Sequence, residues 1–155
     1  MARGDFTLFE ELALTLGTQN WNLANGGNTV KVGLIKIAAT PTAADGTPTW
    51  GDYSANEVSG SNYSAGGATL ASQQFTEASG TATFDADDVT WSQHASGFAV
   101  GASTGAAWGI VYNSTDASSR AIGFVELKSG STTVGNVDGD LTISWNASGI
   151  FTVDA

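Results

Sequence analysis

The sequence contains no cysteine among its 155 residues, which excludes a disulfide bond, a zinc–thiolate site and a cysteine nucleophile. Long apolar runs are also missing, whereas a membrane-spanning helix needs about 20 consecutive apolar residues. A secretory signal peptide needs an apolar stretch of about 7–15 residues, but Glu10 and Glu11 interrupt the apolar residues near the N-terminus. We therefore expect a protein that is made in a cytoplasm, has no membrane partner and is not exported by the general secretory route.

Basic residues are scarce. The chain has 5 Lys and Arg residues against 15 Asp and Glu residues, a formal net charge of −10. Nucleic-acid binding needs clustered Lys and Arg, so we expect no nucleic-acid partner. Only 13% of the residues are charged, against about 25% in an average globular protein. A surface made mainly of Ser, Thr, Asn and Gly suits a protein that packs against others, or an extracellular β domain.

Alternating apolar and polar residues predict β-strands along most of the chain. Such segments are residues 29–37, 81–84, 89–91, 107–112, 121–127, 141–146 and 150–153. Residues 29–37 are apolar on both faces, as in a central strand, while Ile122 and Phe124 are expected on one face of their strand. Residues 38–69 read as long ordered loops with short strands. We predict an all-β fold, an antiparallel β-sandwich or barrel-like domain with one short N-terminal helix.

The N-terminal helix is predicted from a capping box. Thr7 and Glu10 have the Ser/Thr-x-x-Glu spacing of a helix start, and Gly17 suits a helix end. A helix of about ten residues is too short to be stable alone in water, so it must dock on its own domain or on a neighbour. We divide the chain into an arm with a short amphipathic helix (residues 1–20) and a single β domain (residues 21–155). The arm supplies four candidate partner contacts: Phe6, Phe9, Leu12 and Leu16.

The acidic stretch from Asp85 to Asp88 raises the question of a metal or catalytic site. Where an EF-hand calcium loop needs an oxygen ligand, a glycine and a final glutamate, this stretch has Val89, Thr90 and Ser96. The stretch therefore favours an exposed turn before a strand, with a looser calcium site left open. His94 is the only histidine, no Gly-x-Ser-x-Gly motif is present, and paired carboxylates acting as a glycoside hydrolase remain a minor alternative. We expect no catalytic residues, no metal and no cofactor.

Five tryptophans are many for this length. Trp91, Trp108 and Trp145 lie at inward positions of alternating strands, which favours the core. Trp21 and Trp50 lie in loop-like contexts and are further candidate partner contacts.

Four segments carry a resemblance to a known family: residues 54–60 (SANEVSG), 63–71 (YSAGGATLA), 84–91 (FDADDVTW) and 143–150 (ISWNASGI). In this order they resemble small virion structural proteins of tailed bacteriophages, encoded among head and tail genes. The resemblance covers roughly residues 29–153. It implies a virion component that is made in the host cytoplasm and is not an enzyme.

The resemblance and the β fold together suggest a capsid decoration protein of the cement or head-fibre kind. Its partners would be the major capsid protein or other virion proteins. The protein would form a homo-oligomer, a trimer by analogy with other decoration proteins. The alternatives are a tail-tube or neck component, or a fibre component that binds host glycans through Trp21, Trp50 and Tyr53.

Overall fold

The structure is a computed structural model that describes residues 4–154. Within these residues the chain forms ten strands and two short helices. The strands are β1 (Phe6–Leu8), β2 (Val30–Ile35), β3 (Ala68–Thr69), β4 (Gln74–Ala78), β5 (Thr81–Asp85), β6 (Val89–Trp91), β7 (Trp108–Asn113), β8 (Ala121–Glu126), β9 (Leu141–Ile143) and β10 (Phe151–Asp154). The helices are α1 (Leu12–Thr18) and α2 (Trp50–Ser54). The strand pairings are antiparallel, so the predicted all-β, sandwich-like fold is confirmed.

The main sheet has five strands in the order β1-β8-β7-β2-β3. All six residues of β7 are buried, and β2 is buried at all but one position. Both strands are apolar on both faces because each face of this sheet is covered, which confirms the central strand predicted over residues 29–37. The remaining strands form a three-stranded sheet, β10-β5-β4, and a two-stranded sheet, β6-β9.

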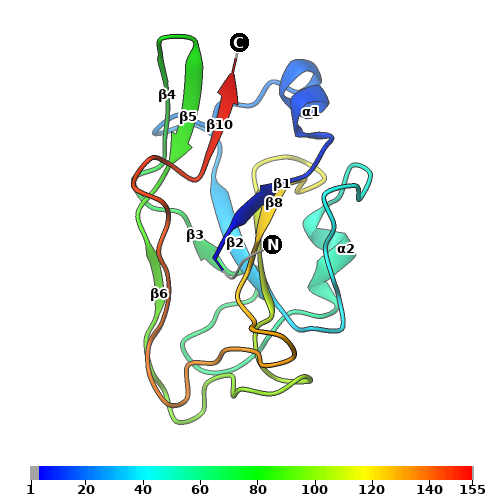
Figure 1. Ribbon diagram of the computed structural model, residues 1–155, viewed down its shortest axis with the longest axis vertical. Helices are drawn as coiled ribbons and strands as arrows, with labels where there is room; N and C mark the ends of the chain where they lie inside the picture. The colour runs from blue at the N-terminus through cyan, green and yellow to red at the C-terminus, as the bar shows by residue number, and fades with distance from the viewer. Residues whose placement is uncertain (1–3, 155) are drawn as a thin grey trace.

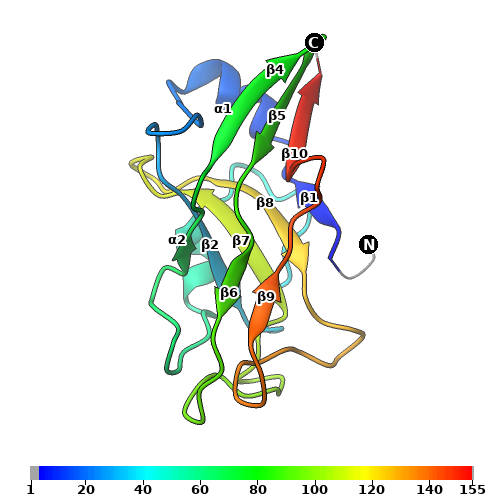
Figure 2. The ribbon, with the colours of Figure 1, turned by 90° about the vertical axis from the view of Figure 1, so that its left-hand side faces the viewer.

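The smaller sheets form a second layer on one face of the main sheet, and α2 covers the opposite face (Figure 1). Figure 2 shows β5 leading into β6 and β9 leading into β10 along the long axis of the molecule. The larger core cluster lies between the two sheet layers and includes Val32, Phe84 and Ile143. A second cluster, the α2-side cluster, contains Tyr53 of α2 with Ile110 and Phe124 of the main sheet.

The predicted helix start at Thr7 is wrong. Residues Phe6–Leu8 form β1, in which Thr7 is paired with Phe124 of β8, and the helix begins only at Leu12. Gly17 lies inside α1, and no side chain caps the start of the helix. The free edge of β8 offers backbone hydrogen bonds to this segment, and tertiary pairing of this kind outweighs a local capping preference.

The predicted arm is therefore built into the domain, because β1 is an edge strand of the main sheet. Residues 1–3 of the arm, and residue 155 of the predicted β domain, lie outside the described residues. The capping box that does form belongs to α2, in the region expected to hold loops and short strands. Thr49 and Asp52 supply it, with the Asp52 carboxylate accepting a 2.8 Å hydrogen bond from the Thr49 amide.

The prediction that Ile122 and Phe124 share one face of their strand is wrong, because β8 contains a β-bulge. Val111 pairs with Gly123 and Tyr112 with Ala121, which leaves Ile122 as the extra residue of β8. The bulge turns Ile122 into the larger core cluster, whereas Phe124 packs in the α2-side cluster. The strict alternation assumed from the sequence therefore fails at this point.

Candidate partner-binding trough

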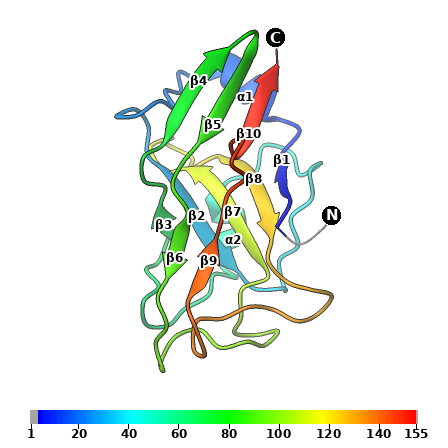
Figure 3. The same cartoon turned by 60° about the vertical axis from the view of Figure 1, so that its left-hand side comes forward.

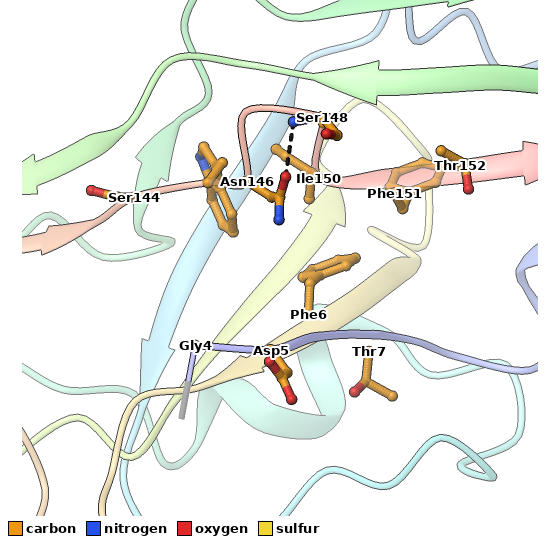
Figure 4. Close-up of a pocket in the computed structure, with 12 residues that line it drawn as sticks. Gly4, Asp5, Phe6, Thr7, Ser144, Asn146, Ser148, Ile150, Phe151 and Thr152 are labelled. Carbon is orange, nitrogen blue, oxygen red and sulfur yellow. Dashed lines mark hydrogen bonds between the residues drawn. The ribbon is translucent and has the colours of Figure 1, made fainter. Parts of the chain in front are cut away.

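The two ends of the described chain border a trough on the protein surface. One wall comes from residues 4–16 and the other from residues 144–153. Two cavities, of ≈ 690 Å³ and ≈ 350 Å³, make up the trough, and Thr152 lines both of them. Figure 4 shows the larger cavity, with Phe6 of β1 facing Ile150 and Phe151 across it. A surface formed in this way depends on the fold to bring distant parts of the sequence together.

Aromatic rings join the two walls of the trough. The Phe6 ring stacks on Phe151 with centroids 6.3 Å apart, and it meets Trp145 edge-on at 6.2 Å. Phe6 also lies over Gly123 of β8, where any Cβ would collide with its ring. Gly123 therefore leaves the space that lets Phe6 sit between the sheet edge and β10.

The larger cavity is the polar half of the trough. Its polar lining side chains are Asp5, Thr7, Ser144, Asn146, Ser148 and Thr152. A tight turn shapes this wall: Asn146 Oδ1 accepts a 2.8 Å hydrogen bond from the Ser148 amide, and the Gly149 amide donates to the Asn146 carbonyl. Gly149 has a φ of 101°, which favours glycine, and a side chain there would collide with Thr83.

The smaller cavity is the apolar half of the trough. Strands β1 and β10, helix α1 and the link between β1 and α1 supply its apolar lining residues, which are Leu8, Phe9, Leu12, Ala13, Leu16 and Val153. Glu10 is the charged residue of this lining. A shallow depression adjoins it across Val153 and is lined by Glu77 and Asp154. The apolar half is thus bordered by acidic side chains.

One edge of β10 runs along the trough. β10 pairs with β5 on one side, and within residues 4–154 no strand pairs with its other side. Figures 2 and 3 show β10 as the outer strand of the three-stranded sheet. An unpaired strand edge presents a row of N–H and C=O groups that can bind another extended chain.

The candidate contacts of the predicted arm divide into two groups. Phe9 is 1% exposed and packs against Tyr53 and Phe124 in the α2-side cluster, and Leu12 is 4% exposed. These two side chains serve intramolecular packing, which was the open alternative for the arm. Phe6 and Leu16 are only partly buried and line the trough.

Trp21 and Trp50 lie outside the trough and apart from each other. Trp21 packs against the larger core cluster and donates a 3.0 Å hydrogen bond from Nε1 to Asp116 Oδ2. Trp50 packs against the α2-side cluster, where it stacks on Tyr112 at 5.0 Å. Trp91 and Trp108 are buried as predicted. The fifth, Trp145, is only partly buried and lines the trough.

Asp116 is held as a carboxylate by its neighbours. Burial alone would raise its pKa. Hydrogen bonds from Trp21 and the Ser118 amide, with the positive charge of Arg120, outweigh burial and lower the pKa below its ordinary value. The Asp116 carboxylate therefore links the segment around Trp21 to the loop after β7.

Asp87 and Asp88 of the acidic stretch accept hydrogen bonds from within the domain. Asp88 Oδ1 accepts a 2.9 Å hydrogen bond from the Trp145 amide, and the Asp87 carbonyl accepts one from Trp145 Nε1. The Asp87 carboxylate accepts a 2.7 Å hydrogen bond from Ser72 Oγ. His94 lies in a loop, where its Nδ1 accepts from the Ser96 amide. Over residues 4–154, no three His, Cys, Asp or Glu side chains lie close enough together to hold a metal ion.

A partly buried polar network was not predicted from the sequence. The Tyr63 hydroxyl donates to Glu57 Oε1 at 2.7 Å and accepts from the Leu34 amide at 2.9 Å. Glu57 also accepts from the Gly66 amide, and the Tyr112 hydroxyl donates to the Gly66 carbonyl. The network fastens residues 57–66 to β2 and β7. Leu34 and Tyr112 are far in sequence from residues 57–66, so no local pattern predicts the network.

Burial is the main cause that raises the pKa of Tyr63 well above its ordinary range, with Glu57 adding to the effect. The same two causes raise the pKa of Tyr112 to about 12.

None of the helices in the described part of the chain has the length and apolar character needed to cross a membrane. Comparison of the chain with protein-family models, curated proteins and solved structures found no match.

Proposed function

We propose that this protein is a structural component of a tailed-bacteriophage virion, a decoration protein that stabilises the capsid through protein–protein contacts. The observation that carries the proposal is the trough. It combines a strand edge that is unpaired within residues 4–154 with an apolar cavity, on a chain that has few charged residues. Such a surface suits attachment to another protein, and no step of chemistry is needed for it.

The resemblance to phage virion proteins supports the same proposal, because its four segments meet in the fold. The Tyr63 hydroxyl donates to Glu57, which joins the first segment to the second. The Asp87 amide donates to the Ala71 carbonyl, which joins the second segment to the third. Asp88 and Trp145 join the third segment to the fourth, as does the hydrogen bond from the Ile150 amide to the Phe84 carbonyl. Segments that are scattered in the sequence thus belong to one structural unit.

The mechanism would be additional buried interface between neighbouring capsid subunits. Each contact that forms only on the intact shell makes separation of the subunits more costly. The shell would then resist the internal pressure of packaged DNA better with the protein than without it. The predicted homo-oligomer stays a prediction, and its mass in solution would test it.

Binding to isolated phage heads that lack the protein tests the proposal. We expect the purified protein to sediment with such heads, to saturate at a fixed number per head, and to raise the temperature at which the heads release DNA. Tails prepared from the same phage are the control and should bind none. Protein that stays in the supernatant with heads at saturating concentration would contradict the proposal.

The alternative of a glycan-binding fibre component finds less support. The three aromatic residues expected to serve it lie on opposite sides of the main sheet, with Trp21 against the larger core cluster and Trp50 and Tyr53 in the α2-side cluster. The Tyr53 hydroxyl is also engaged with Asp45 at 2.8 Å. The tail-tube and neck alternatives are separated from decoration by the position of the protein on the virion.

A further inference from the structure

We infer that the trough receives an extended segment of a different protein, which adds a strand to the free edge of β10 and places apolar side chains against α1. The inference deepens the proposed function and rests on it for the identity of the partner as a capsid protein. It goes further by specifying the conformation, side-chain pattern and charge of the segment that binds.

The backbone of β10 supplies the first part of the argument. Because β5 is the strand that β10 pairs with among the described residues, the other edge of β10 can form a further antiparallel or parallel ladder. Strand addition to an open sheet edge is a common mode of peptide recognition, in which main-chain hydrogen bonds give affinity and side-chain pockets give specificity. Thr152 is exposed at the middle of this edge and faces both halves of the trough.

The apolar half of the trough specifies the side chains of the partner. Successive side chains of an added strand point to opposite faces, so alternate residues would enter the cavity between Leu16 of α1 and Val153 of β10. Both side chains are partly exposed in this structure, and an apolar partner would remove them from water. The expected segment therefore has apolar residues at every second position.

The acidic border specifies the charge of the partner. Glu10, Glu77 and Asp154 lie around the apolar half, and the cavities there have no Lys or Arg in their lining among residues 4–154. A segment with Lys or Arg next to its apolar residues would complement them.

A second copy of this chain fits less well, because β4 and β10, the edge strands of the three-stranded sheet, carry Glu77 and Asp154, and the whole chain has a net charge of −10.

The absence of cysteine allows a direct test by site-specific cross-linking. The variant Thr152→Cys, labelled with a benzophenone maleimide, is bound to phage heads, irradiated and analysed by peptide mass spectrometry. We expect cross-links to one segment of a capsid protein with alternating apolar residues and a neighbouring basic residue. The matched control is Leu14→Cys, because Leu14 lies on α1 outside the trough and is 60% exposed.

An affinity measurement on the same heads is independent of the label. Leu16→Asp puts a charge into the apolar half and should weaken binding about tenfold or more, equivalent to about 1.4 kcal/mol. Leu14→Asp should leave the affinity unchanged, and circular dichroism melting of both variants checks that they fold.

Three results would overturn the inference. The first result is that the Thr152→Cys variant binds heads but gives no cross-link, or cross-links to a second copy of this chain. This result would contradict strand addition and leave the decoration proposal standing. Equal binding of the Leu16→Asp and Leu14→Asp variants would do the same. A wild-type protein that does not bind heads at all would remove the proposed function, and the inference with it.

Discussion

Tyr63 shows how one side chain can take the place of a strand partner. Its hydroxyl accepts the hydrogen bond of the Leu34 amide in β2, at a point where no neighbouring strand does so. The Glu57 carboxylate then accepts from the hydroxyl, so the buried Leu34 amide and the partly buried Tyr63 hydroxyl both have partners. A network of this kind is costly to break, since each buried polar group left unsatisfied costs about 1–3 kcal/mol.

The three tyrosines lead to a prediction at high pH. Burial raises the pKa of Tyr53, Tyr63 and Tyr112, with nearby carboxylates adding to the effect, and Tyr112 reaches about 12. A raised folded pKa contributes stability that is complete below the unfolded value of about 10 and is lost as pH rises through the folded value. At about pH 11, one unit above that unfolded value and one unit below the pKa of Tyr112, we expect the native protein to show only about a tenth of the phenolate absorbance of one tyrosine.

The same measurement in denaturant is the control, since unfolded tyrosines should titrate near their ordinary pKa of about 10. A native titration curve with even one tyrosine ionising at that ordinary pKa would show that the corresponding hydroxyl is not held as described.

Two short segments of this chain carry the same helix-start pattern, and only one of them starts a helix. Thr7 to Glu10 has the pattern but contributes to strand β1, whereas Thr49 to Asp52 caps α2. The difference lies in the surroundings, because the first segment pairs with β8 over three residues, whereas Thr49 forms only an isolated bridge with Arg120 before β8 begins. Local sequence cannot reveal that edge, so the sequence predicted the helix at the wrong start.

The two patterns make a matched pair of variants. Asp52→Ala removes the acceptor for the Thr49 amide and hydroxyl, both at 2.8 Å, and should lower the free energy of unfolding by about 1 kcal/mol. Glu10→Ala removes an exposed side chain that lies before α1 and is not the N-cap of that helix. This variant should change the free energy of unfolding by less than about 0.5 kcal/mol. Urea unfolding measures both, and equal losses would contradict the assignment of the cap.

The strands that the sequence revealed are those with a buried face. β2, β7 and β8 have strong apolar patterns because both faces of the main sheet are covered. β4 was missed because it is an edge strand with four of its five residues exposed, which leaves no alternation to detect. The bulge at Ile122 was not predicted for another reason. An extra residue changes the register of the strand without changing the composition of the sequence.

The trough could not be predicted from the sequence. Phe6, Phe9, Leu12 and Leu16 were expected to be contacts of the N-terminal arm, and that role stays a prediction. Phe6 and Leu16 line the trough with partly exposed side chains, whereas Phe9 and Leu12 are buried beneath it. The opposite wall comes from residues 144–153, and only the completed fold brings the two segments together. Trp145 was expected in the core because residues 141–146 alternate, but β9 ends at Ile143 and Trp145 is only partly buried.

At the scale of the whole molecule, the N-terminal segment is part of the fold. Deleting residues 1–17 would remove β1 from the main sheet and leave a void where the fully buried Phe9 packs. Loss of a buried Phe alone costs about 3–5 kcal/mol, so we expect the truncated protein to be unfolded or aggregated. Circular dichroism and size-exclusion chromatography check this, with the full chain as control. A truncated protein that melts like the full chain would show that the segment is dispensable for folding.

The central claim is that this protein decorates the capsid of a tailed phage, and imaging of intact virions tests it most directly. Gold-labelled antibodies raised against the purified chain are applied to virions that carry its gene and viewed by electron microscopy. The claim predicts label spread over the whole head. Label confined to the tail or its tip, or no label on any virion, would contradict it.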